Sequence, residues 1–164
     1  MIRPAGPGDA GAVAHIYNYY IANTVVTFEE GAVSPRDMRG RIATSITSDL
    51  PWLVAEDDAG DVVGYAYASQ WQGRCAYRFA VEVTVYLSDA ATSRGWGSRL
   101  YDALFSDLRN KSMHVVIGGI ALPNPASVAL HEKFGMEKVA HFREVGFKFG
   151  HWVDVGYWQG MLND

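Results

Sequence analysis

The sequence predicts a single α/β domain, residues 1–164, in which helices flank both faces of a mixed, mostly antiparallel central sheet. The first observation is composition: 164 residues, 49% apolar and 20% charged, suit one domain with a real core rather than a disordered chain. The second is the order of patterns: a strand, two helices, an antiparallel strand pair, two strand–helix units and a closing hairpin. The third is a strand–glycine–helix stretch at residues 82–108, around which the other elements are arranged.

In this central stretch the spacing of the apolar residues changes from every second residue to every fourth. Apolar and polar side chains alternate over residues 83–87, which favours a strand. After the glycines, a leucine recurs every fourth residue from Leu100 to Leu108, as in a helix with one buried face. We therefore expect a strand that leads through a short loop into a helix.

Gly95 and Gly97 lie at the start of this helix, beside Arg94. The first turn of a helix leaves free N–H groups at its positive end, and small residues let an anion approach them. The pattern differs from the dinucleotide fingerprint, which needs a third glycine where Leu100 stands, and from the P-loop, whose Gly-Lys-Ser/Thr is absent. We interpret it as a phosphate-binding cradle; a tight turn without a ligand is the alternative.

The first half of the chain carries two helix starts. Asp9 is a fair N-cap, and Ser34 followed by Pro35 combines a cap with the preferred first helical residue. Residues 57–61 form a polar loop between two apolar runs, as in a hairpin. The sequence predicts a strand at 2–3, a helix at 9–21, an extended segment at 23–30, a helix at 34–47 and strands at 51–56 and 62–68.

In the second half, two strands each lead into a helix. Asn124 stands between two prolines, so it caps the following helix rather than lying within it, and Gly135 ends that helix. The sequence predicts strands at 77–87 and 114–120, a helix at 126–134, and closing strands at 137–143 and 151–159 around a connection at 144–150.

Composition also excludes several classes of function. A formal charge of −4 argues against a dedicated nucleic-acid binder. The single Cys75 excludes an internal disulfide and a multi-cysteine zinc site, and the five histidines lack metal-ligand spacing, so we expect no metal. No apolar run is long enough for a membrane span, and the first residues do not resemble a signal peptide. A soluble, cytoplasmic protein is expected.

Several segments match a known pattern over nearly the whole chain. They are Ile16-Tyr17-Asn18, Asn23-Thr24, 77–82, 85–87, 122–124, Ser127-Val128, His131-Glu132, 146–150 and 152–159. In these segments, and in the order of its elements, the chain resembles the GNAT acetyltransferases, in particular the branch of phosphinothricin and methionine sulfoximine or sulfone acetyltransferases. The resemblance implies the GNAT fold, acetyl-CoA as donor, an α-amino group as acceptor, and a homodimer.

The resemblance also implies a set of donor-binding residues. The backbone of Val85, Tyr86 and Leu87 is expected to pair with the pantetheine amides. The remaining expected contacts are Ser93, Arg94, Gly95, Trp96, Gly97, Ser98, Asn124 and Lys133. One position departs from the family: Thr92 stands where the cradle pattern has Gln or Arg, so one cation is missing there and Arg94 is the candidate replacement. Trp96 is expected either to point away from the donor or to line its wall.

Acetylation of an amine requires a base, because an α-ammonium group is mostly protonated at pH 7. Glu82 is the candidate, since a carboxylate within an apolar strand is costly to bury without a purpose; an outward-facing Glu82 is the alternative. The resemblance adds His131 as an auxiliary, a proton relay or an acid for the leaving thiolate, with Tyr86 as an alternative donor. Ordinary packing is the other interpretation of His131.

Acceptor recognition is expected beyond Glu82. Arg74 and Arg78 are the cations nearest in sequence for a carboxylate, and aromatic side chains are candidates for the walls. The expected acceptor-binding residues are Phe28, Arg74, Cys75, Ala76, Tyr77, Arg78 and Phe149. Cys75 is an alternative nucleophile, but direct attack of the amine on the thioester is the favoured mechanism.

Three functions fit these residues. The first is acetyl transfer to a small amino acid analogue; the second keeps acetyl-CoA but uses a polyamine, an aminoglycoside or a protein N-terminus; the third is a non-catalytic acyl-CoA sensor. A pocket lined by Arg and aromatic residues favours the first, a wide acidic groove favours the second, and Glu82 argues against the third.

Overall fold

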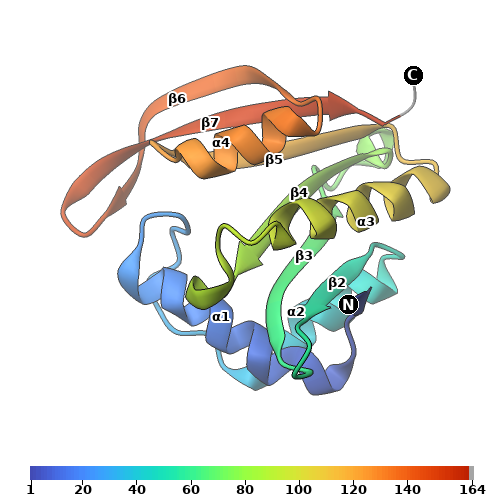
Figure 1. Ribbon diagram of the computed structural model, residues 1–164. Helices are drawn as coiled ribbons and strands as arrows, with labels where there is room; N and C mark the ends of the chain where they lie inside the picture. Colours follow the sequence, from blue (N-terminus) through green and yellow to red (C-terminus); the bar gives the residue numbers. More distant parts are fainter. Residues whose placement is uncertain (163–164) are drawn as a thin grey trace.

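A computed structural model of the protein, which describes residues 1–162, has a seven-stranded sheet with helices on both faces (Figure 1). The strands are β1 (Ile2–Pro4), β2 (Trp52–Glu56), β3 (Val62–Gln70), β4 (Ala80–Leu87), β5 (Val115–Leu122), β6 (Glu137–Lys148) and β7 (His151–Met161). The helices are α1 (Ala10–Asn23), α2 (Pro35–Thr47), α3 (Trp96–Asn110) and α4 (Pro125–Lys133), with short 3-10 turns η1 (Pro7–Asp9), η2 (Cys75–Tyr77) and η3 (Asp89–Ala91). The strand order is β1-β2-β3-β4-β5-β7-β6, and only β4 and β5 run parallel, which confirms the predicted fold class.

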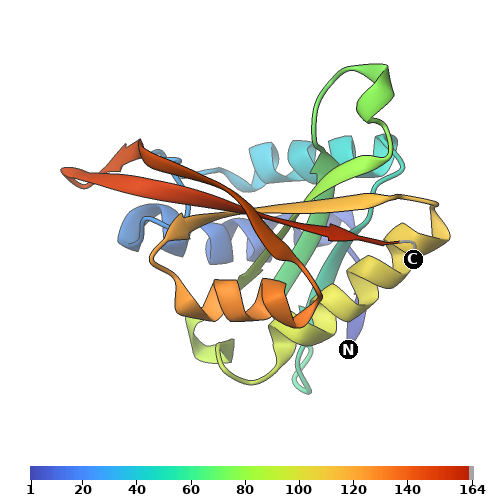
Figure 2. The same cartoon turned by 90° about the horizontal axis from the view of Figure 1, so that it is seen from above.

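The sheet separates two hydrophobic cores. On one face, α1 and α2 bury Val13, Met38 and Ile42 against aromatic residues of β2 and β3. On the other face, the predicted leucine row of α3 is fully buried together with Tyr101. Figure 2 shows α1 and α2 on one side of the sheet and α3 and α4 on the other. The sheet is thus held rigidly from both sides.

The predicted helix caps are confirmed with one correction. The Ser34 hydroxyl accepts from the Asp37 N–H at 3.0 Å, and the Asn124 side chain accepts from the Ser127 N–H at 3.2 Å. Asp9 makes no cap hydrogen bond to α1. Its carboxylate instead binds the Arg3 guanidinium at 2.8 Å and the Gly6 N–H at 2.7 Å, because a buried carboxylate gains more from a cation than from an amide.

Two predicted element boundaries are wrong. The strand predicted from residue 77 begins only at Ala80, because residues 75–77 form the turn η2. The connection predicted at 144–150 is largely strand: β6 continues to Lys148, and the hairpin turn narrows to Phe149 and Gly150. A bulge before Gly146 interrupts the alternation of β6, and the resulting sequence looks like a loop.

Candidate active site

The parallel strands β4 and β5 separate partway along their length. They pair only where Ala80–Glu82 faces Val115–Ile117, and β4 continues without this partner to Leu87. On its other side β4 is paired with β3 throughout, and the Ser88 N–H donates to the Val63 carbonyl. Because antiparallel bonding alternates, this contact directs the peptide groups of Val85 and Leu87 away from β3 and into the gap. The structure therefore exposes a strand edge where the donor's amide arm was expected.

A groove of about 450 Å³ follows this strand edge. It passes from Tyr86 along Leu87 to the start of α3 and is closed on the other side by α4. Its lining includes Val85, Tyr86, Leu87, Ser93, Gly95, Gly97, Ser98 and Asn124, which are eight of the eleven predicted donor-binding residues. The predicted cradle and strand edge thus form one continuous groove.

Glycine is required at positions 95 and 97 of the cradle for different structural reasons. Gly95 precedes α3 with φ of 80°, in the left-handed region, so its backbone conformation turns the chain into the helix. Gly97 lies against α4, and a Cβ there would come within 3.3 Å of Leu130. The close approach of α3 to α4, as well as access for an anion, therefore requires a small residue at position 97.

Three predicted cradle residues are absent from the groove lining. Trp96 packs against the hydrophobic core beneath the Arg99 guanidinium, whose Cζ is 4.1 Å from the ring centroid, so its bulk points away from the groove. Arg94 does not line the groove, whereas the Lys133 ammonium donates to the Ser98 hydroxyl at 2.9 Å and thereby stands beside the start of α3. Thr92 does line it, but its hydroxyl donates to the Asp89 carbonyl at 2.9 Å and does not cap α3.

Beyond Tyr86 lies a second cavity of about 560 Å³. Its lining is mainly aromatic and aliphatic, and Glu82 is the single charged side chain that the described residues contribute to it. The lining residues are Val26, Thr27, Phe28, Tyr67, Glu82, Thr84, Tyr86, Gly119, Ala121, Phe142, Val145, Val155 and Tyr157. We call this cavity the acceptor pocket. It shares Tyr86 and Val26 with the groove, so the two meet at that point.

The Glu82 side chain faces this pocket, which excludes the outward-facing alternative. A Cβ added to Gly119 would lie 3.6 Å from Glu82 Oε1, so the carboxylate sits beside the bare backbone of β5. Burial raises the pKa of the Glu82 carboxyl above its ordinary value. Within residues 1–162 no side chain forms a hydrogen bond or ion pair with this carboxylate, and its raised pKa suits a proton acceptor.

Tyr86 stands at the junction of groove and pocket. Its ring contacts the Tyr17 and Tyr20 rings, with centroids 5.3 and 5.0 Å apart, and burial raises the pKa of its hydroxyl well above the ordinary value. A small cavity of about 60 Å³ connects it to Asn124 and His131. Tyr86 therefore keeps its proton and lines both cavities.

His131 is buried in the structure and both of its ring nitrogens have partners. Nδ1 is 2.7 Å from the Ser127 carbonyl, and Nε2 is 3.0 Å from the Tyr101 hydroxyl. Burial lowers the pKa of the imidazole, so it is neutral at pH 7. A Cβ on Gly118 would come within 2.6 Å of the ring, which shows how closely α4 packs on β5. This geometry supports a structural role; an acid role stays a prediction.

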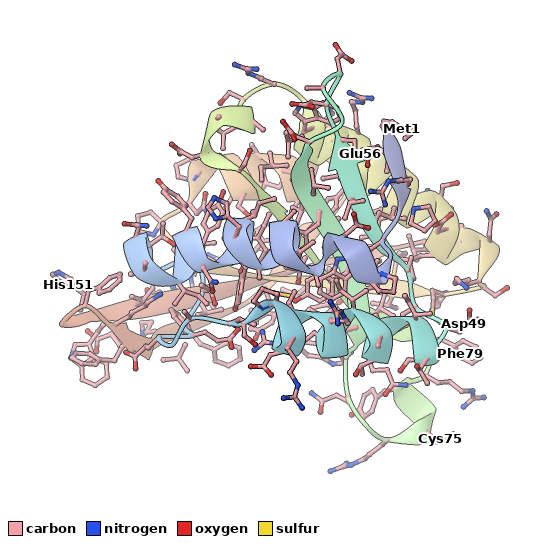
Figure 3. All side chains as sticks on the ribbon, turned by 90° about the horizontal axis from the view of Figure 1, so that it is seen from below. Met1, Asp49, Glu56, Cys75, Phe79 and His151 are labelled. Atoms are coloured by element: carbon pink, nitrogen blue, oxygen red, sulfur yellow. The ribbon has the colours of Figure 1, made fainter. Side chains whose placement is uncertain are left out.

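The predicted acceptor residues are divided between two places. Phe28 lines the pocket, and its ring lies so close to Gly146 that a Cβ there would overlap it. Residues 74–78 do not line the pocket, and Figure 3 shows Cys75 on a loop that protrudes from the body of the protein. Phe149 lies at the hairpin tip, outside the pocket lining. The expected convergence of Arg74 and Arg78 on Glu82 is therefore not seen within this chain.

Sequence reasoning missed most of the pocket wall. Tyr67, Phe142, Val145 and Tyr157 come from three different strands and share no local motif. One signal was available: Thr84 lies two residues from both Glu82 and Tyr86, so all three occupy one face of β4. Once Glu82 was assigned to the site, this alternation already predicted Thr84.

Known proteins share this family and this fold. The acetyltransferase (GNAT) domain family matches residues 2–156. The phosphinothricin N-acetyltransferase of Streptomyces viridochromogenes is 40% identical over 96% of this chain and 85% of its own length. The L-methionine sulfoximine/L-methionine sulfone acetyltransferase of Pseudomonas aeruginosa is 35% identical over 99% of this chain and 94% of its own.

Solved structures agree closely with the fold. A GNAT phosphinothricin acetyltransferase from Sinorhizobium meliloti in complex with acetyl-CoA superposes with a TM-score of 0.96 at 35% identity, covering 98% of this chain and 87% of that one. A ribosomal-protein-alanine N-acetyltransferase from Brucella melitensis gives a TM-score of 0.95 at 34% identity, covering 98% and 99%.

Fold and site together define an N-acetyltransferase that takes acetyl-CoA as its donor. The chain belongs to the GNAT acetyltransferase family. Within residues 1–162, no helix is long and apolar enough to cross a membrane. The same residues bring together no group of three His, Cys, Asp or Glu side chains suited to a metal ion.

Proposed function

We propose that the protein transfers the acetyl group of acetyl-CoA to the α-amino group of a small amino acid analogue of the phosphinothricin, methionine sulfoximine or methionine sulfone type. The amine attacks the thioester directly in a ternary complex. The observation that carries this proposal is the position of Glu82, an unpaired carboxylate in a pocket that opens where the donor groove ends. The named activities of the two relatives above support the choice of acceptor.

The groove fits the donor through its backbone. The diphosphate would be held by the N–H groups at the start of α3, with Lys133 beside Ser98 adding a cation. The peptide groups of Val85 and Leu87 would pair with the pantetheine amides, although the Leu87 carbonyl already accepts from the Tyr20 hydroxyl at 2.6 Å. Bound there, acetyl-CoA supplies an activated thioester. An amide N–H near Val85 would polarise its carbonyl oxygen.

Glu82 then acts as the base. Its carboxylate accepts the proton of the α-ammonium group, directly or through one water, and so supplies a neutral amine. The raised pKa brings the carboxylate closer to the pH at which it works. Tyr86, which lines both cavities, supplies the proton for the leaving thiolate and regains one as the acetylated nitrogen loses its second proton, whereas both nitrogens of the neutral His131 are engaged.

One observation favours a second acceptor class. Among residues 1–162, the acceptor pocket is lined by Glu82 as its single charged side chain and by no cation that could bind an acceptor's carboxylate. A protein N-terminus has an α-amine but an amide in place of the adjacent carboxylate, so it fits this lining. The structural similarity to a ribosomal-protein-alanine N-acetyltransferase is in line with this alternative.

A panel assay that follows release of the CoA thiol tests these proposals. We expect the highest kcat/KM with methionine sulfoximine, methionine sulfone or phosphinothricin, compared with spermidine, an aminoglycoside and an N-terminal alanine peptide. A preference for the peptide would support the second acceptor class. Acetyl-CoA binding without transfer to any of these amines would favour the sensor.

We also propose a homodimer in the cytoplasm. The β6–β7 hairpin exposes an unusual set of aromatic side chains: Phe142 51%, Phe147 55%, Phe149 55% and Trp152 64%. Exposed aromatic clusters of this kind are typical of protein interfaces. Trp158 on β7 is not part of this surface, because it is buried in the core at 3%. Sedimentation analysis of the protein and of a Trp152→Ser variant tests the dimer.

A further inference from the structure

Strand β6 departs from regular pairing beside the acceptor pocket. Phe142 faces Val155 on β7, and Gly146 faces Val153, so three residues of β6, 143–145, stand opposite the single residue Asp154. Glu144, in the middle of these three, has φ of 52°, in the left-handed region that L-residues rarely adopt. We call residues 143–145 the β6 bulge. A conformation of this kind persists only where other contacts hold it.

Asp154 supplies such contacts with both carboxylate oxygens. Oδ1 accepts from the Glu144 N–H at 2.8 Å, and Oδ2 is 2.7 Å from His141 Nε2. The Lys138 ammonium lies 2.8 Å from His141 Nδ1. Because an ammonium group only donates, Nδ1 accepts here, and the ring proton is on Nε2, facing Asp154. These residues form a continuous hydrogen-bonded chain from Lys138 to the backbone of the bulge.

The bulge carries part of the acceptor pocket. Val145, its last residue, lines the pocket, and so does Phe142, immediately before it. Both residues are more than half exposed and belong to neither hydrophobic core, and the Phe142 ring packs edge-on against the Tyr157 ring at 5.9 Å. The bulge also borders a second, open hollow, which is lined by His141, Phe142, Arg143, Glu144, Val145 and Asp154. The position of this pocket wall therefore depends on the backbone of the bulge.

We propose that Asp154 is a positioning residue for acetyl transfer: its carboxylate fixes the β6 bulge and thereby the wall of the acceptor pocket formed by Phe142 and Val145. This inference rests on the proposed function of that pocket. Asp154 touches neither substrate in this account. It acts through the backbone, so its loss should affect acceptor binding and leave the donor groove, on the other side of Tyr86, unchanged.

Steady-state kinetics on Asp154→Ala test this with the best acceptor of the panel. We expect the acceptor KM to rise about tenfold, the scale of losing one well-placed pocket contact. We expect kcat and the KM for acetyl-CoA to stay near wild type. Asp154→Asn keeps an oxygen for the Glu144 N–H and should recover part of the effect. Lys111→Ala, which removes a surface ion pair to Asp49 far from the pocket, is the matched control.

A double-mutant cycle gives the sharper test. If Asp154 acts through the pocket wall, Asp154→Ala should raise the acceptor KM much less in a Val145→Ala background than in wild type. The proposal would be overturned by an equal rise of the acceptor KM in both backgrounds or by an unchanged acceptor KM. Parallel changes in the KM for the acceptor and the KM for acetyl-CoA would also overturn it. Hydrogen exchange at the Glu144 amide measures, without turnover, whether Asp154 fixes the bulge. The exchange should be faster in Asp154→Ala than in wild type and unchanged in Lys111→Ala. If wild type acetylates no amine, the proposed function fails, and this exchange measurement still decides whether Asp154 fixes the bulge.

Discussion

The donor groove and the acceptor pocket are built in different ways. The groove consists largely of backbone: the start of α3, the unpaired edge of β4, and small residues that allow close approach. The pocket consists of side chains from the 24–30 segment and from strands β3 to β7. A backbone site tolerates many side chains, whereas a side-chain pocket changes with each substitution. The two sites should therefore respond differently to mutation.

The largest loss of activity is expected from replacing Glu82, the one charged side chain among the described residues of the pocket lining. Glu82→Gln removes the proton acceptor and nearly preserves shape, so kcat/KM should fall by about 10²–10⁴. Acetyl-CoA affinity, measured by calorimetry, should stay near wild type because Glu82 does not line the groove. A variant with near wild-type turnover would remove Glu82 from the mechanism.

A backbone change should affect the donor side alone. Gly95→Ala places a Cβ in a left-handed conformation at the start of α3, at a cost of about 1–2 kcal/mol. We expect a higher KM for acetyl-CoA with an unchanged acceptor KM. Gly60→Ala is the matched control, because its φ of 85° imposes the same strain in a hairpin remote from the site. Equal kinetic effects of the two variants would mean that the strain, not the groove, is responsible.

The pH dependence of kcat/KM tests whether Glu82, rather than another titratable group, is the base. Glu82 must be ionised to accept a proton, and burial raises the pKa of its carboxyl. Activity should therefore be lost as pH falls through a pKa above the ordinary range of a glutamate. This acid limb of kcat/KM should be absent from the residual activity of Glu82→Gln. An identical acid limb in that variant would assign it to another group.

The smallest effect is expected at the rim of the groove. Lys133→Ala removes the ammonium beside Ser98, an exposed contact of the kind worth roughly 0.2–1 kcal/mol. The KM for acetyl-CoA should rise a few-fold, and less at high salt. The effect should be absent from Lys111→Ala.

The same contrast explains what could be predicted from the sequence. The glycines at the start of α3, the alternation over 83–87 and the cap at Asn124 are local signals, and they predict the position of the groove. The pocket wall depends on register: Tyr157 reaches Gly119 only because β5 pairs with β7 at that point. The protruding 74–78 loop and the β6 bulge are set by tertiary pairing, so the strand start predicted at residue 77 and the connection predicted at 144–150 are wrong, while the roles of Arg74 and Arg78 stay predictions. Local sequence is not sufficient at Trp96, because the pattern around it does not decide whether the side chain lines the donor site or points away from it.

The most direct test of the account is a crystal structure of the protein with acetyl-CoA and an acceptor amine. The account predicts the diphosphate on the backbone N–H groups at the start of α3, and the thioester at Tyr86 with the amine between it and Glu82. A donor bound elsewhere, or an amine bound out of reach of Glu82, would contradict it.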